Sequence, residues 1–506
     1  MKKILFTIGG LLLVSTVFTQ NINDALRYGN SEVQGSARFR ALSGAFGALG
    51  GDMSAVSINP AGSAIFSVSH ASFSLAINNK KNETAFFGTQ NSERNGNFDL
   101  TQGGAAFIFK SNNESSKFKK FTLGLAYDKT GDFDNDWFAS GNNTNNSIGN
   151  YFLQNAQGLR LDEISAFPGE STSDAYSGIG SAYGSQHQQA YLGYDSYILE
   201  PNDITDDGNT LYTSNIAAGN YNQEYSYAST GYNGKLAFNF ATQYTDKFYF
   251  GLNLNSHFLN YERSTFLYEE NDNGGIIKQV AFQNNLVTTG NGFSFQLGSI
   301  MKLSKDVRLG LSYNSPTWYT IEDETTQLIE TLRDDAGTDV LQIVDPQIIN
   351  IFPRYRLQTP SSITGSLAYI FGKSGLISFD YGRKNYGNTK FKPKSDTYFS
   401  ELNRNIEDQL TSANTYKIGG EYKIKQLSLR AGYRFEESPY KNKTTIGDLS
   451  GYSLGLGYSF GNTKLDLTYD TSQQDRNQSL YNVGLTDAAA IDSKISNITL
   501  SLGFNL

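Results

Sequence analysis

The stretch GYSLGLGYSF, residues 451–460, decides the fold, because its aromatic and aliphatic residues alternate with glycine and serine. Alternation with a period of two predicts a β-strand with one apolar face and one small or polar face. The segments 463–470 and 498–506 repeat the pattern. A soluble sandwich would bury such apolar faces in a core, whereas a membrane barrel turns them outward to lipid. The polar face, which includes Lys464, Asp466 and Asp470, then points inward.

Similar segments run back along the chain and predict about fourteen antiparallel strands. Besides the last three, they begin near Ser69, Gly103, Phe121, Gly234, Phe248, Leu286, Val307, Ser362, Leu376, Tyr416 and Leu427. Short connections alternate with long ones, such as 131–223, 264–285 and 471–492. Short periplasmic turns and long outer loops are typical of outer-membrane barrels. The first strand must pair with the last, because an open edge in hydrocarbon leaves amides unsatisfied.

The composition excludes several classes of function. The 506 residues include 32 Tyr, 34 Phe and 50 Gly, with three His, no Cys and a net charge of -8. This balance argues against a nucleic-acid partner, and the absence of cysteine removes disulfides, thiolate metal sites and a lipoprotein anchor. We therefore expect no cofactor, no metal site and no enzymatic activity. The aromatic surplus suits the girdles of a membrane barrel.

The first twenty residues have the character of a secretory signal. Lys2 and Lys3 precede an apolar run from Ile4 to Val14, which is too short to span a membrane as a helix. We expect this segment to export the protein toward the cell outer membrane.

Residues 21–66 do not alternate and are rich in Gly, Ala and Ser. They include Phe39, Leu42, Phe46 and Phe66, and a disordered periplasmic tail would be more polar. We predict that this segment plugs the lumen as a hatch. The expected organisation is a signal peptide at 1–20, a hatch at 21–66 and a barrel with long extracellular loops at 67–506.

The hatch segment resembles a known family. The run SARFRALSGA at 36–45, the GALGGD run that ends at Asp52, and the Asn59-Pro60-Ala61 step are similar to the hatch of the FadL/TodX outer-membrane transporters. The resemblance implies an all-β, transmembrane antiparallel barrel of about 14 strands plugged by a small N-terminal hatch. It also implies passive uptake of long-chain fatty acids or other hydrophobic small molecules, through capture, hatch rearrangement and lateral diffusion.

Two interpretations of the apolar hatch residues are open. Phe39, Leu42, Phe46 and Phe66 either line a ligand pocket or form the hatch's own core. The transporter hypothesis expects that pocket to be apolar. Asn59, Pro60 and Ala61 are expected to fix the bend that joins the hatch to the first strand, because Pro restricts the preceding residue to extended conformations.

The charged hatch residues are expected to act as clamps. Arg38, Arg40 and Asp52 should pair with inward barrel charges, for which the candidates are Glu421, Arg430, Arg434 and Asp466. An Arg that binds a fatty-acid carboxylate is the alternative.

Two catalytic or metal-binding patterns are rejected. The G-x-S-x-G match at 451–455 lies in an alternating strand without the strand-turn-helix context of a nucleophile elbow. Asp132, Asp134 and Asp136 have the spacing of a calcium loop, but Trp137 stands where glycine is needed and no Glu closes the loop. A solvated acidic loop is the expected structure there.

Two alternatives to uptake stay open: a barrel that docks proteins for secretion or surface assembly, and a haem-type receptor using His187 in the longest loop. The spacing of Phe399, Leu402, Ile406 and Leu410 predicts an amphipathic helix, either packed on its own loops or gating the mouth. The expected partners are a hydrophobic ligand, outer-membrane lipid and lipopolysaccharide, and the barrel assembly machinery, with the protein a monomer.

Overall fold

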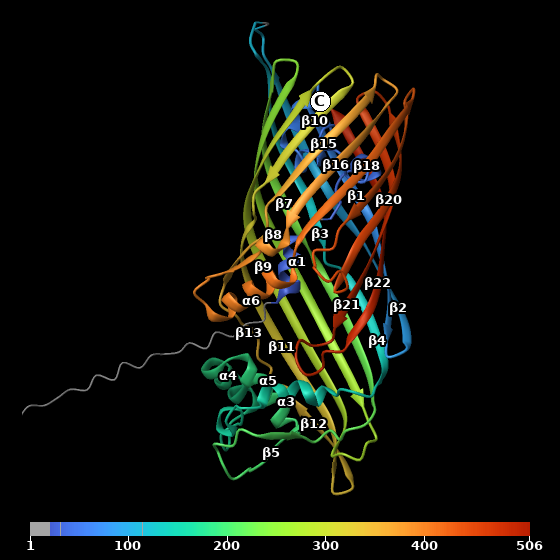
Figure 1. The fold of residues 1–506 in the computed structure, drawn as a ribbon. Helices are drawn as coiled ribbons and strands as arrows, with labels where there is room; N and C mark the ends of the chain where they lie inside the picture. The colour runs from blue at the N-terminus through green and yellow to red at the C-terminus, as the bar shows by residue number, and fades with distance from the viewer. Residues whose placement is uncertain (1–20, 31, 114) are drawn as a thin grey trace, which may run out of the picture.

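The wall of the molecule is a closed antiparallel β-barrel (Figure 1). The computed structural model describes residues 21–506 except 31 and 114, so the predicted signal at 1–20 lies outside the described residues. Fourteen strands make one circuit: β1(His70–Phe86), β2(Thr89–Lys110), β3(Phe118–Asp132), β7(Tyr221–Tyr244), β8(Phe248–Glu270), β9(Ile277–Lys302), β10(Val307–Asn314), β15(Ser362–Phe371), β16(Gly375–Asn385), β18(Ser412–Ile424), β19(Leu427–Glu436), β20(Ile446–Ser459), β21(Thr463–Ser479) and β22(Ala488–Asn505). The predicted strand count is confirmed.

The remaining strands extend this wall. β4(Asn135–Asn143) continues along β7, and β11(Trp318–Asp335) continues along β9. β12(Thr338–Val344), β13(Asn350–Ile351) and β14(Tyr355–Gln358) return along β11, with β17(Lys390–Lys392) on β14. β5(Leu199–Pro201) and β6(Tyr212–Ser214) form a separate pair.

Closure occurs as predicted. β1 pairs with β22 from the His70 and Asn505 partners to the Ala85 and Ala490 partners. The side chains alternate in the membrane sense: Leu454 is 58% exposed, whereas the adjacent Ser453 is 2% exposed and faces the lumen. No helix within the described residues 21–506 is long and apolar enough to cross a membrane.

The end of the barrel opposite the C-terminus carries a helical unit, drawn at the lower end of Figure 1. The orientation predicted above makes this the extracellular end. It consists of α3(Ile148–Ala156), η3(Leu161–Glu163), α4(Thr172–Tyr183) and α5(Ser185–Asp195). Phe152 of α3 packs on the inward Phe282 of β9, with ring centroids 5.2 Å apart. The loops predicted at 264–285 and 471–492 are shorter in the structure, because β8, β9 and β21 continue as strands beside this unit.

The predicted amphipathic helix is confirmed as α6(Thr397–Gln409), which follows η4(Tyr386–Asn388). Its buried Phe399, Leu402 and Ile406 belong to the same apolar cluster as Leu26 of the N-terminal segment. The helix therefore packs on that segment and on the nearby strands.

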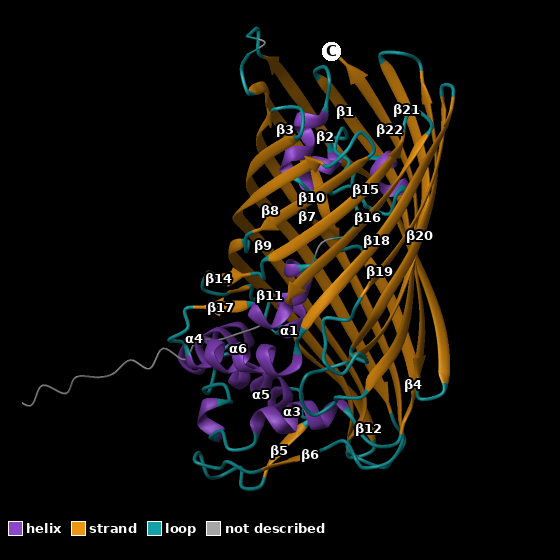
Figure 2. Cartoon of the chain, turned by 45° about the horizontal axis from the view of Figure 1, so that its top comes forward, coloured by secondary structure: helices purple, strands orange, loops and turns teal. Residues whose placement is uncertain are grey.

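The N-terminal segment fills the lumen with short helices, which Figure 2 shows inside the barrel. These are α1(Ile22–Gly29), α2(Ala37–Ala41), η1(Ser54–Ser57) and η2(Pro60–Ile65). Asn21 caps α1 in a capping box, and the Ser36 hydroxyl accepts a bond from the Phe39 amide at the start of α2. Caps matter here because a buried helix end leaves amides that water cannot reach.

Glycines on the lumen face of the barrel let the hatch backbone approach closely. A Cβ atom built on Gly310 of β10 would lie 2.2 Å from the carbonyl oxygen of Gly47. On neighbouring β15, Gly365 lies on the outward face with the exposed Ile363 and Leu367, and a Cβ there would meet nothing within 4 Å.

We predict that Gly310→Ala loosens the hatch while Gly365→Ala does not. The first substitution overpacks the contact with Gly47, which should lower the free energy of unfolding by about 1–3 kcal/mol. The measurement is the folded, heat-modifiable fraction on gels across a urea series. Equal midpoints for both variants would contradict this account of the close contact.

Candidate functional site

A buried ion pair joins the hatch to the barrel. Arg40 is 1% exposed, and its Nε and Nη2 donate to the two carboxylate oxygens of Asp470 over 2.8 and 3.0 Å. The amide of Asn497 also donates to Asp470, over 2.8 Å. The predicted clamp by Arg40 therefore exists, but its partner lies on β21 two inward positions from the expected Asp466.

A second ionic cluster lies nearby. The Nε of Arg38 is 2.9 Å from Glu421, which also lies 2.6 Å from the Nε of Arg430, and Arg430 in turn pairs with Asp466 over 2.5 Å. The predicted contact of Arg38 with a barrel charge is confirmed.

The predicted pairing of Asp52 with a barrel charge, and of Arg434 with the hatch, is wrong. Asp52 accepts bonds from the Ser36 hydroxyl at 2.8 Å and the Ser54 amide at 2.9 Å, so it braces the hatch internally. Arg434 pairs with Glu436 on its own strand.

The predicted apolar ligand residues divide between two environments. Phe39, Leu42 and Phe46 belong to one buried cluster, and the Phe39 and Phe46 ring centroids are 5.5 Å apart. Phe66 stacks on His70 with centroids 4.9 Å apart. Only Phe39 of these four lines a cavity among those described below, and ligand contact by the set stays a prediction.

The Asn59-Pro60-Ala61 step joins the hatch to β9. The Asn59 oxygen accepts from the Ala61 amide at 3.1 Å, which caps η2. Its nitrogen donates to the carbonyls of Gly47 at 2.7 Å and Ser299 at 3.0 Å. One side chain therefore holds the turn, the preceding hatch loop and the wall together.

The serine of the rejected G-x-S-x-G pattern has a structural role. Ser453 lies in β20, as expected, and its hydroxyl donates to the carbonyl oxygen of Ala41 over 2.9 Å. It also bonds to the Ser43 hydroxyl over 2.9 Å. Its surroundings are therefore those of a hatch anchor.

The histidines do not converge on one site. His187 in α5 contacts Glu163 at 3.4 Å, His70 stacks on Phe66, and His257 bonds to Ser294. Within residues 21–506 that the structure describes, no group of three or more His, Asp or Glu side chains could hold a metal ion.

An outer vestibule of about 580 Å³ lies between α1, the extracellular strands and the loop after β21. Its wall is mixed. Glu32, Lys80, Asp132 and many Asn, Gln, Ser and Thr residues line it, together with an aromatic and aliphatic set and two arginines: Leu26, Phe133, Trp137, Tyr227, Tyr261, Tyr440, Tyr481, Arg27 and Arg476. The Arg27 guanidinium lies 4.0 Å from the Tyr261 ring centroid and pairs with Asp24. The buried Nε of Arg476 has no hydrogen-bond partner among the described residues.

A second space, the inner cavity, has a volume of about 190 Å³ and lies between the hatch and the wall. Tyr28 and Gly29 of α1 line it, so α1 stands between it and the outer vestibule. Burial raises the pKa of the Tyr28 phenol above its ordinary value, so this side chain stays neutral.

The chemistry of the inner cavity is polar. Its lining includes Lys235, Lys384, Lys417, Asp128 and His257, with several Asn, Gln, Ser and Thr side chains. The prediction of an apolar pocket beside the hatch is therefore wrong for this cavity. The cause is the alternation itself, because the lumen face of each strand carries the polar set.

The wall is interrupted between β2 and the β3–β4 ribbon. Paired residues of β2 and β3 run only from Gln102 and Asp128 to Lys110 and Lys120. Beyond them, β2 pairs only with β1, while β3 and β4 pair with β7. We call this interruption the side gap.

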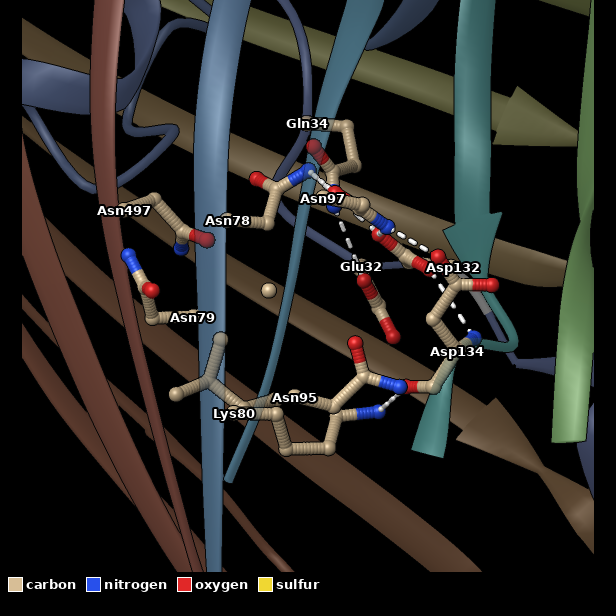
Figure 3. Close-up of a pocket in the computed structure, with 12 residues that line it drawn as sticks. Glu32, Gln34, Asn78, Asn79, Lys80, Asn95, Asn97, Asp132, Asp134 and Asn497 are labelled. Atoms are coloured by element: carbon tan, nitrogen blue, oxygen red, sulfur yellow. Dashed lines mark hydrogen bonds between the residues drawn. The ribbon is translucent and has the colours of Figure 1, made fainter. Parts of the chain in front are cut away.

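Polar side chains bridge the side gap, as Figure 3 shows. Asn97 donates to Asp132 at 3.1 Å and also bonds to Asp134, and the Lys80 ammonium donates to the Asp134 carbonyl at 2.7 Å. The prediction of a solvated acidic loop at Asp132 to Asp136 is therefore wrong. These residues join the edge of the β3–β4 ribbon to β1 and β2 across the side gap.

The hatch reaches the side gap. The Glu32 amide donates to the carbonyl of Thr130 over 2.9 Å, and Glu32 and Gln34 line a small cavity of about 20 Å³ there (Figure 3). Burial raises the pKa of the Glu32 carboxyl. The hatch, the inner cavity and the gap are thus contiguous.

These features define an outer-membrane barrel whose lumen is plugged by its own N-terminal segment. The family model described as outer membrane protein transport protein (OMPP1/FadL/TodX) matches residues 207–505, and the chain therefore belongs to this family of outer-membrane transporters for hydrophobic compounds. No curated protein matches the chain in sequence.

Solved structures share the fold. A FadL homologue from Pseudomonas aeruginosa matches at 12% identity and a TM-score of 0.54, over 94% of this chain and 99% of that one. The toluene transporter TodX from P. putida matches at 13% identity and a TM-score of 0.53, over 95% and 99%.

We predict that Arg40→Gln frees the hatch. Asp470 would be left in the lumen without its charged partner, and breaking a buried pair costs about 3–5 kcal/mol. Liposomes containing the variant should therefore admit a small sugar faster than wild type. Arg434→Gln, which leaves the hatch contacts intact, is the matched control. A sugar flux equal to wild type in both variants would show that the pair does not hold the plug.

Proposed function

We propose that the protein imports amphipathic carboxylates, of which long-chain fatty acids are the simplest, by diffusion without energy input. The observation that carries this proposal is the outer vestibule, where aromatic walls surround Arg27 and Arg476. An apolar tail gains about 25 cal/mol for each Å² that it buries. A guanidinium binds a carboxylate through two parallel hydrogen bonds. Arg27 already pairs with Asp24, whereas the Nε of Arg476 has no hydrogen-bond partner among the described residues and is the better candidate for the carboxylate.

The route continues past α1 to the inner cavity. Displacement of Tyr28 would join the two spaces, and Lys235, Lys384 and Lys417 would then face the carboxylate. A fully apolar compound would displace water from the polar side chains of this cavity and could not replace the hydrogen bonds that the water made to them. The polar cavity therefore supports an amphipathic substrate better than a hydrocarbon of the kind named for TodX.

We propose the side gap as the exit into the membrane. At the side gap, side-chain hydrogen bonds replace the backbone hydrogen bonds that join neighbouring strands elsewhere. Local opening there therefore breaks fewer backbone hydrogen bonds than elsewhere in the wall. Because Glu32 of the hatch binds Thr130 at this edge, a hatch movement and the opening of the gap are mechanically linked.

The remaining features of the proposal follow from the setting. We expect the protein to be exported by the segment at 1–20, inserted by the barrel assembly machinery and surrounded by lipid and lipopolysaccharide as a monomer. We propose no catalytic role. Phe39, which lines the inner cavity, is the member of the predicted apolar set that we expect to contact the ligand.

Arg476→Gln should weaken binding of a radiolabelled long-chain fatty acid to the detergent-purified protein by about tenfold, the loss of roughly one charge-assisted contact. Binding of the corresponding fatty alcohol should change little. Arg383→Gln, on the outside of β16, is the control variant. If folded wild-type protein binds neither compound, the uptake function itself is refuted.

Joining the edges of the side gap should stop uptake. The chain has no cysteine, so Asn97→Cys with Asp134→Cys can be linked by a short thiol cross-linker. We expect uptake into whole cells to fall to the level of a barrel-free strain, and binding in detergent to persist. The control is Phe107→Cys with Leu123→Cys, a pair inside the intact β2–β3 ladder. Normal uptake through the Asn97 cross-link would place the exit elsewhere.

A further inference from the structure

Three cations face one another across neighbouring strands on the outside of the barrel. Lys81 of β1 is the register partner of Arg94 on β2 and of Lys494 on β22. Arg94 and Lys494 are exposed, and the Lys81 side chain is 39% exposed. Like charges placed directly opposite each other destabilise a sheet, so this row needs a compensating anion.

The protein compensates the cations from one side only, through Glu83 and Asp492, which lie two residues farther out along β1 and β22. Lys81 forms an ion pair with Glu83 on its own strand. Among the described residues, Arg94 and Lys494 take part in no ion pair. On the other side of the row, toward the apolar belt, the register partners Asn79, Gly96 and Ser496 carry no charge. The cation row, defined as Arg94, Lys81 and Lys494, can therefore contact a phosphate from that side.

The height of the row places it at the lipid head groups. Ile77, Phe98 and Ile498 also share one register position, and they are the outermost large exposed apolar side chains within β1, β2 and β22. The cation row lies four residues farther out along each strand, which is about 13 Å at the rise of a β-strand. Acyl chains against the apolar side chains would bring their phosphates to this level.

A polar groove continues outward from the row. Its volume is about 940 Å³, and Glu83, Asp475 and Asp492 line it together with Gln90, Asn91 and Ser92. Lys443, Asp448 and Arg476 line its far side. Asp492 is the register partner of both Glu83 and Asp475. Carboxylates and amides on a shallow outer surface can accept and exchange hydrogen bonds with sugar hydroxyl and amino groups.

We infer that the outer face of β2, β1 and β22 binds a phosphorylated glycolipid of the surrounding leaflet. Its acyl chains lie along Ile77, Phe98 and Ile498, its phosphate contacts the cation row, and its sugars enter the groove. The apolar contacts and the cation row face the membrane and do not depend on the proposed transport substrate, whereas the groove borders the outer vestibule at Arg476 and Asn477.

The test is native mass spectrometry of the detergent-purified full chain titrated with diphosphorylated lipid A. The triple variant K81Q/R94Q/K494Q should bind at least about tenfold more weakly than wild type, since each basic group near an anionic surface contributes appreciably. The charge-conserving K81R/K494R variant should retain binding.

The control is Arg383→Gln, because Arg383 faces outward from β16 with Ile363 and Asn414 as its register partners, so no like charge opposes it. Heat-modifiable mobility shows that each variant is folded. Unfolding of the triple variant in lipid-free detergent should occur at the same or higher denaturant concentration, because repulsion has been removed.

Two further ligands separate the possible sources of the phosphate. Dephosphorylated lipid A should bind at least about tenfold more weakly than the diphosphorylated form if the cation row reads the phosphate. Inorganic phosphate alone, at the same concentration, should not bind. Equal binding of lipid A by wild type and the triple variant, or equal binding of the dephosphorylated lipid or of inorganic phosphate, would overturn the inference.

Discussion

Closure of the backbone ladder by β1 and β22 is the constraint on which the rest of this molecule depends. An amide without a partner in hydrocarbon costs several kcal/mol, so the chain must return to its first strand before it can lie in a membrane. The return encloses a lumen lined by the polar faces of all fourteen strands. That lumen lets a short segment with Arg38 and Arg40 find buried carboxylates on strands distant in sequence.

The lumen has a polar part and a more apolar part, because the barrel strands extend well beyond the thickness of a membrane. Within the apolar belt the inward residues are polar, and they form the inner cavity around the hatch. Beyond the belt the outward residues become polar, and inward groups such as Leu267 and Phe282 pack on the extracellular helices.

Alternation was enough to predict the strands, the closure and the outward apolar faces. The hatch was predicted from a different signal: residues 21–66 do not alternate, and their apolar side chains, such as Phe39, Leu42 and Phe46, indicated burial. Alternation could not identify Asp470 as the partner of Arg40. The alternation shows which residues of a strand face the lumen. It does not show the stagger between strands, which sets the height of each inward residue along the barrel. The acidic residues at Asp132 to Asp136 misled for another reason: Asp is rare in strands, yet here these side chains join an edge that has no backbone partner.

The places where the hatch is fastened have a consequence for the order of folding. Ala37, Arg40 and Ser43 bind Ser501, Asp470 and Ser453, more than 400 residues away. The earliest part of the described chain to leave the ribosome thus has its anchors on the last strands to be made. Contacts of such long range form slowly, so the plug must wait while the wall assembles. Seating the plug is thereby a check that the C-terminal strands are in place.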